Sequence, residues 1–82
     1  MNLERGTVVK SLNGRDKNKY FCVLDKQGDY VLYCDGCVRR LEKPKRKKVK
    51  HVQVTRVKLQ TEALQVNKHI KEALRGLNIV EE

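Results

Sequence analysis

The sequence predicts a mainly β fold, a small barrel of five short strands followed by one or two C-terminal helices. Short β-branched and aromatic runs, separated by turn-forming residues, fill the chain up to residue 58. From Leu59 onward the apolar residues recur every three or four positions, which is helical spacing. A chain of 82 residues is long enough for one domain with a small core. We therefore expect a barrel over residues 1–58 and a helical extension over residues 59–82 that packs on it.

Five runs predict the strands of this barrel. The predicted strands cover residues 7–11, 19–25, 30–34, 37–41 and 51–55. Turns between the first four are predicted at Asn13-Gly14, Gln27-Gly28-Asp29 and Asp35-Gly36. Three successive hairpins make a meander, which the fifth strand closes. Five short, strongly bent strands around few apolar side chains favour a small SH3-like barrel, because curling removes the exposed edges of so small a sheet.

The C-terminal part of the chain predicts a helix from residue 67 to residue 75. Asn67 is its expected N-cap and Gly76 its expected stop, and the preceding turn is a separate short helix. The apolar face of this helix consists of Ile70, Ala73, Leu74 and Leu77. We expect this face to pack on the barrel, since apolar helical faces are mostly buried within their own domain. Docking on a partner protein is the alternative.

The net charge of +9 is concentrated in one segment. Residues 39–58 hold ten Lys and Arg against the single acid Glu42, whereas the other residues hold nine bases and nine acids. A neutral body with one basic segment indicates a polyanionic partner, because solubility alone requires no such concentration of charge. We expect the cations of this segment and its histidine to contact phosphates: Arg39, Arg40, Lys43, Lys45, Arg46, Lys47, Lys48, Lys50 and His51. Pro44 favours an extended chain at the entry to the lysines, and the arginines suit bidentate contacts.

The loop between the first two strands is the second candidate site. A bend at Asn13-Gly14 lets Arg15 and Lys17 project from a stiff hairpin, and this geometry aims cations at phosphates. The other loop candidates are Lys10, Asn13, Gly14 and Lys19. We expect Gly14 to supply a backbone conformation with positive φ and Asp16 to brace the loop.

Two neighbouring aromatic residues begin the second strand. Tyr20 and Phe21 must face opposite sides of the sheet. We expect Tyr30 and Tyr33 to pack in the barrel wall. Because aromatic residues make up only 5% of the chain, recognition of structured RNA by shape and backbone is favoured over serial base stacking.

The strand, loop and strand from Gly6 to Leu24 resemble the KOW motif, in which one glycine precedes an apolar strand and a second, here Gly14, sits in the following loop. The segment Leu41 to His51 continues the likeness. Together they resemble small bacterial KOW proteins related to the large-subunit ribosomal protein family numbered fourteen-e of archaea and eukaryotes. The resemblance implies an SH3-like barrel that binds ribosomal RNA and associates with the ribosome. It also implies that Phe21 lies in the core, which leaves Tyr20 outside and available to stack on a base or ribose. These segments cover most of residues 3 to 55.

Several other functions have little support in the sequence. Cys34-Asp35-Gly36-Cys37 has the spacing of half a zinc knuckle, but the remaining candidate ligands are single and dispersed, so we expect no metal or other cofactor. No nucleophile, histidine pair or carboxylate pair has a telling spacing, so we expect no enzyme. Without a signal peptide or a span of membrane length, we expect a cytoplasmic monomer with reduced cysteines. The lysine-rich run also satisfies the pattern of a nuclear localisation signal.

The sequence thus predicts a non-enzymatic RNA-binding protein that docks a glycine-containing loop and a basic segment on structured ribosomal RNA. A protein-interaction module is the alternative, because SH3-like barrels also dock on ribosomal proteins or polymerase. Binding of double-stranded DNA is a second alternative. If one RNA contacts both candidate sites, the Gly14 loop and the segment after Pro44 must lie on a common side of the molecule.

Overall fold

The computed structural model describes residues 3–80, with side chains through residue 77, so residues 1, 2, 81 and 82 of the two predicted ranges lie outside it. Five antiparallel strands form one sheet in the order β4-β3-β2-β1-β5. The strands are β1 (Thr7–Ser11), β2 (Tyr20–Gln27), β3 (Tyr30–Cys34), β4 (Lys45–Lys48) and β5 (Val52–Lys58). Two 3-10 turns, η1 (Val49–His51) and η2 (Thr61–Leu64), precede β5 and the helix α1 (Asn67–Val80).

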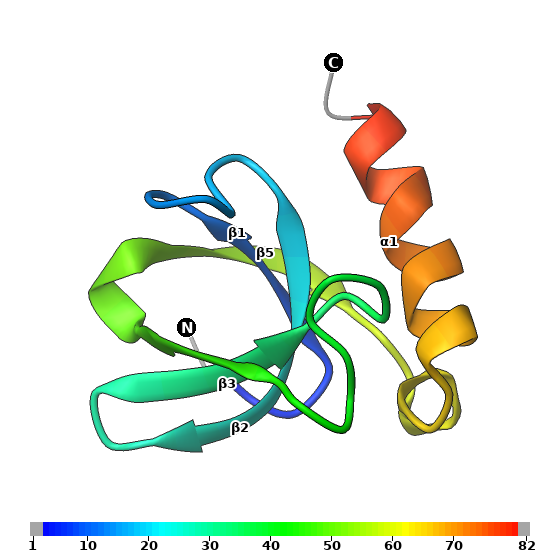
Figure 1. Cartoon of the computed structure of the whole chain (residues 1–82), viewed down its shortest axis with the longest axis horizontal. Helices are drawn as coiled ribbons and strands as arrows, with labels where there is room; N and C mark the ends of the chain where they lie inside the picture. The colour runs from blue at the N-terminus through cyan, green and yellow to red at the C-terminus, as the bar shows by residue number, and fades with distance from the viewer. Residues whose placement is uncertain (1–2, 81–82) are drawn as a thin grey trace.

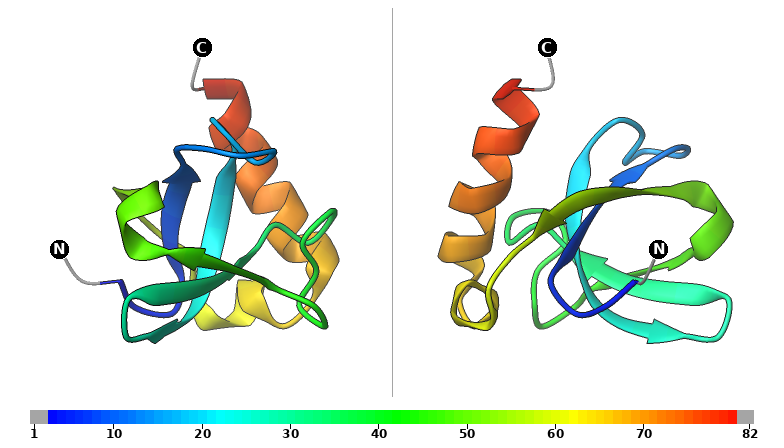
Figure 2. Two further views of the ribbon diagram at one scale, coloured as in Figure 1. Left: turned by 60° about the vertical axis from the view of Figure 1, so that its left-hand side comes forward. Right: turned by 180° about the vertical axis from the view of Figure 1, so that it is seen from behind.

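The sheet curls strongly on itself, and α1 stands against its outer side (Figures 1 and 2). Strands β1 to β4 are joined by successive hairpins, and β5 returns to pair with β1. No hydrogen-bonded ladder joins β4 to β5 within residues 3–80, so the sheet is open between its two edge strands. The predicted mainly β architecture with a C-terminal helix is confirmed, and η1 carries the chain across the open side.

The predicted strands at 7–11 and 30–34 are confirmed, and β2 runs two residues further than predicted, with a bulge between Val23 and Asp25. The fourth predicted strand, at 37–41, is wrong. The Asp35 carboxylate accepts hydrogen bonds from the backbone N–H groups of Cys37 and Arg39 at 2.9 and 2.8 Å. These donors are therefore taken by a side chain in place of a strand ladder. Strand β4 forms instead from the lysine-rich run.

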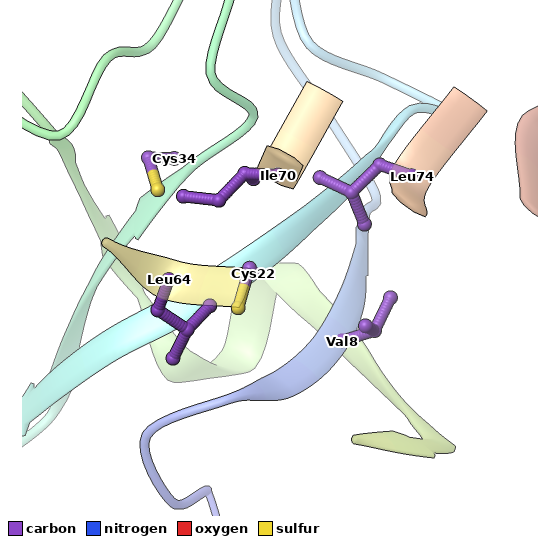
Figure 3. Packing of buried hydrophobic residues seen from close by; sticks show 6 residues of the cluster. All are labelled: Val8, Cys22, Cys34, Leu64, Ile70 and Leu74. Carbon is purple, nitrogen blue, oxygen red and sulfur yellow. The ribbon is translucent and has the colours of Figure 1, made fainter. Parts of the chain in front are cut away.

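The core has two layers, one on each face of the sheet. The inner layer fills the curl and consists of Val9, Phe21, Val23, Val31, Tyr33 and Val52. The second layer lies between the sheet and the helical segment and consists of Val8, Cys22, Cys34, Leu64, Ile70 and Leu74 (Figure 3). Successive residues of a strand point to opposite faces, and both faces are covered here, which explains the continuous apolar runs.

The C-terminal helix has Asn67 as its first residue and does not stop at Gly76. A glycine inside a helix costs only about 1 kcal/mol relative to alanine. Burial of Leu74 before it and packing of Leu77 after it outweigh that cost.

The predicted N-cap role of Asn67 is wrong, because its side chain bonds Leu41 and Glu42, and the Val66 carbonyl accepts the hydrogen bond of the first turn from the N–H of Ile70. The separate short helix expected before α1 is η2. No helix in the described part of the chain is long and apolar enough to span a membrane.

Candidate nucleic-acid interface

The β1–β2 loop, residues 12–19, is ordered by its own backbone. Gly14 has a φ of 75° and Asn18 a φ of 69°, so the chain reverses through two left-handed residues. The N–H of Asn18 donates to the Ser11 carbonyl at 2.8 Å, and the N–H of Lys17 donates to the Gly14 carbonyl at 3.2 Å. The predicted positive φ of Gly14 is confirmed. The loop is a compact platform, and its cations Arg15, Lys17 and Lys19 are exposed on it.

A buried carboxylate holds this loop in place. Asp16 is only 5% exposed, and its Oδ2 accepts hydrogen bonds from the Tyr33 hydroxyl at 2.9 Å and from Arg39 Nε at 3.2 Å. Burial alone raises the pKa of Asp16. The bonds from Tyr33 and Arg39, together with the positive charges of Arg39 and Lys47, outweigh burial, so the pKa of this carboxyl lies below its ordinary value. The predicted bracing role of Asp16 is confirmed.

Strand β4 comes directly against the loop. The Lys47 ammonium donates a hydrogen bond to the Asn13 carbonyl at 3.0 Å. A Cβ built on Gly14 would lie 3.4 Å from the same Nζ. The loop tip and the segment after Pro44 therefore lie side by side, as the sequence-based hypothesis requires.

The strand conformation divides the basic run between two faces of the sheet. Lys45 pairs with Tyr33 and Lys47 with Val31, so these two lysines lie on the inner face, and Lys47 reaches the loop. Arg46 and Lys48 alternate with them and lie on the outer face. There the Arg46 guanidinium carbon is 3.8 Å from the centre of the Tyr30 ring. The lysine-rich run is thus two rows of cations.

The connection between β3 and β4, residues 35–44, presents a basic hollow of about 520 Å³. Its lining combines five cations with one acid and two apolar residues: Val38, Arg39, Arg40, Glu42, Lys43, Pro44, Lys45 and Arg46. The helix holds this connection, because Asn67 Oδ1 accepts a hydrogen bond from the Leu41 N–H at 2.8 Å. Arg39 lines the hollow and also binds Asp16, so the hollow adjoins the loop platform.

Some of the predicted site residues have other contacts. Tyr20 lies on the face opposite Phe21, as predicted, but it is half-buried and packs against the helix-side core, which leaves less of its ring available for stacking. The helix covers the face that the sequence left open. Lys10 pairs directly with Tyr20 and lies on that same face.

Arg39 is an ion-pair partner with 26% of its side chain exposed. Lys50 and His51 belong to η1, where Lys50 is exposed and the His51 carbonyl accepts a hydrogen bond from the N–H of Leu12 at 2.9 Å.

Tyr30 is exposed to a ligand in a way that the sequence does not predict. In place of packing in the barrel wall, it lies half-buried on the outer face beneath Arg46. Its position follows from the pairing of β3 with β4, which brings Tyr30 opposite Lys48. A lysine-rich run is a poor strand signal, because lysine is depleted in strands. All four residues of β4 are cations, so no alternation of polar and apolar residues marks this strand in the sequence.

The cysteines lie in two environments. Burial raises the pKa of Cys22 to about 12 and that of Cys34 to about 11, while Cys37 is exposed. Within residues 3–80, no group of three or more His, Cys, Asp or Glu side chains is placed to hold a metal ion. Cys34 belongs to the helix-side core, so the two sulfurs of the Cys34 to Cys37 segment do not share a surface.

Comparison with models of known protein families finds no match, and a search of curated proteins finds none either.

Proposed function

We propose that this protein binds structured RNA through one basic surface, formed by residues 13–19 and the cations Arg39, Arg40, Lys43, Lys45 and Lys47. We call it the loop–strand surface. The hydrogen bond from Lys47 to the Asn13 carbonyl carries the proposal, because it joins the two cation groups. The two cation groups lie far apart in the sequence, and each group alone would be an ordinary basic segment.

The stiffness of the surface supports backbone recognition. The loop is held by Asp16 and its own hydrogen bonds, and Lys45 and Lys47 are held by the β3–β4 ladder. Cations on a rigid scaffold lose little side-chain and backbone freedom when they meet phosphates. Phosphate contacts fix the position of a nucleic acid without reading its bases. The surface therefore suits a folded RNA with a defined backbone shape.

The resemblance to KOW proteins extends the proposal to the fold and the RNA. We interpret the curled sheet as a member of the SH3-like barrel class whose edges are bridged by η1. The likeness of the Gly6 to Leu24 and Leu41 to His51 segments to the fourteen-e family makes ribosomal RNA the proposed partner, with the protein acting as a ribosomal or ribosome-associated component in the cytoplasm. No catalytic step is part of the proposal.

Salt dependence tests the proposal. Binding to a ribosomal RNA stem-loop is measured over a range of salt concentrations. With about five phosphates neutralised, the slope of log affinity against log salt lies near −3.5 to −4.5. The double variant Arg15→Glu and Lys17→Glu should bind more weakly and reduce the magnitude of this slope by about 2. The control variant, Lys71→Glu with Arg75→Glu, makes the same charge change on the exposed side of α1 and should keep the slope.

Each alternative has its own outcome in this experiment. If the loop variant binds like the control variant, the loop–strand surface is not the RNA site. A duplex DNA that competes as well as the RNA supports DNA binding. Absence of salt-dependent RNA binding, together with salt-insensitive capture of a ribosomal protein, supports the protein-interaction module.

A further inference from the structure

We propose that the outer face of the β3–β4 hairpin is a second contact site, at which an unpaired RNA base stacks on the guanidinium of Arg46. This inference rests on the proposed RNA-binding function and names the kind of RNA that the protein prefers. That RNA is a helix with an unpaired nucleotide, such as a bulge, beside the segment that meets the loop–strand surface.

Tyr30 holds the guanidinium of Arg46 in a position where a base can stack on it. The guanidinium carbon lies 3.8 Å from the centre of the Tyr30 ring, well inside the range of a cation–π contact. Pairing of β3 with β4 holds both side chains on one face, because Tyr30 lies opposite Lys48 and Arg46 opposite Leu32. The flexible arginine side chain is thereby held against an aromatic ring, which lowers the entropy cost of its next contact.

The side of Arg46 away from Tyr30 is free for a ligand. Arg46 is exposed, and no carboxylate pairs with it in the described part of the chain. A guanidinium is planar and weakly hydrated, and its face stacks on aromatic rings. Unpaired RNA bases are bound in this way, on aromatic side chains or on arginine planes. A base on Arg46 would complete a stack of ring, guanidinium and base.

A neighbouring hollow can receive the rest of the nucleotide. It has a volume of about 440 Å³ and is lined by Asp29, Tyr30, Lys48, Val49 and Lys50. Lys48 and Lys50 supply charge for a phosphate. Asp29 supplies an acceptor for a ribose hydroxyl, which DNA lacks at the 2′ position. Tyr30 lines this hollow and also contacts Arg46, so the site for the base and the site for its sugar and phosphate are adjacent.

The site lies across the edge strand from the loop–strand surface. Strand β4 is the edge of the sheet, with Lys47 directed toward the β1–β2 loop and Arg46 on the other face. The β2–β3 turn and η1 flank this edge, at the end of the sheet away from α1 (Figure 1). An RNA that crosses the edge therefore offers its duplex backbone to one face and an unpaired nucleotide to the other.

A pair of RNAs separates stacking from charge. One is a ribosomal-type stem-loop with a single bulged adenosine, and the other is identical except that the bulged nucleotide lacks its base. Both carry the same phosphates. The protein should bind the adenosine bulge about fivefold or more tightly, a factor typical of one stacked base.

Arg46→Lys keeps the charge and removes the plane, so this variant should bind both RNAs equally and retain the salt slope. The control Arg75→Lys makes the same exchange at an exposed arginine of α1, outside both proposed contact sites, and should keep the preference for the adenosine bulge. Tyr30→Leu removes the ring and should act like Arg46→Lys. Circular dichroism confirms that each variant is folded.

The outcomes distinguish this inference from the function on which it rests. Salt-dependent binding with equal affinity for both RNAs overturns the stacking site alone. A preference that survives in Arg46→Lys also overturns it. Failure to bind either RNA overturns the RNA-binding function and the stacking site together.

Discussion

The two loops that carry cations both turn through a left-handed glycine, but the surroundings of that glycine differ. Gly14 in the β1–β2 loop has a φ of 75°, and Gly36 in the β3–β4 connection has a φ of 77°. A Cβ on Gly14 would meet only the flexible end of Lys47, at 3.4 Å. A Cβ on Gly36 would lie 2.1 Å from the Asn67 carbonyl oxygen. The first loop is held by its own backbone hydrogen bonds and by Asp16 beneath it, and the second by its packing and the Asn67 hydrogen bond against α1.

This difference shows two ways in which a loop can expose cations while its backbone stays fixed. The β1–β2 loop keeps an open tip, since its anchor is the carboxylate of Asp16 beneath it. The β3–β4 connection is closed against the helix through Gly36 and Asn67, and it exposes its cations along the outer rim. The contacts that hold the two loops are separate, except that Arg39 of the β3–β4 connection binds Asp16 of the β1–β2 loop.

The largest effect is expected at the closed loop. Gly36→Ala should lower the free energy of unfolding by about 3 kcal/mol, since a side chain at this φ meets the backbone of α1. Urea denaturation measures the change. Gly28→Ala is the control, because Gly28 also has a positive φ, of 61°, with nothing within 4 Å of its Cβ position. It should lose about 1 kcal/mol. Equal losses in the two variants would contradict the close packing of Gly36.

The anchor of the open loop should give the next largest effect. Asp16→Asn removes the charge that accepts hydrogen bonds from Tyr33 and Arg39, and it should destabilise the protein by about 2 kcal/mol at pH 7. RNA affinity should also fall, because the loop cations lose their fixed position. Asp29→Asn removes an equal charge from an exposed position and should leave stability within about 0.5 kcal/mol of the parent.

Low pH should remove the stabilisation that the ionised Asp16 carboxylate provides. The pKa of Asp16 is lower in the folded protein than in the unfolded chain, so its contribution is fully present above the unfolded value of about 4. It is lost as pH falls through the folded pKa. Denaturation of the parent and of Asp16→Asn from pH 7 to pH 2 measures the difference in stability. That difference should be constant above about pH 5 and shrink below about pH 4. A constant difference throughout would contradict the lowered pKa.

The smallest effect is expected at the open tip. Gly14→Ala should cost about 1 kcal/mol, the strain of a left-handed backbone, because Lys47 can move away from the new methyl group. Gly14→Asn should cost less, since asparagine adopts this conformation more readily than alanine. Thermal denaturation of the two variants gives the order. A cost like that of Gly36→Ala would show that the tip is packed more closely than its surroundings indicate.

Local signals in the sequence were sufficient for much of this molecule. Strands β1 and β3, the start of α1 at Asn67 and the left-handed Gly14 all depend on neighbouring residues, and all were predicted. The concentration of positive charge and the bracing role of Asp16 were also predicted. Periodicity and turn chemistry act over a few residues, so they can be identified without a fold.

Only the tertiary structure decided which segment became β4 and what the half-buried Tyr20 and Tyr30 contact. Asp35 and Asn67 took the backbone donors of residues 37–41, and β3 paired with the lysine-rich run instead. That pairing set Tyr30 beneath Arg46, while the helix covered Tyr20. Strand partners and covered faces depend on contacts between distant segments, and these form only when the whole chain packs.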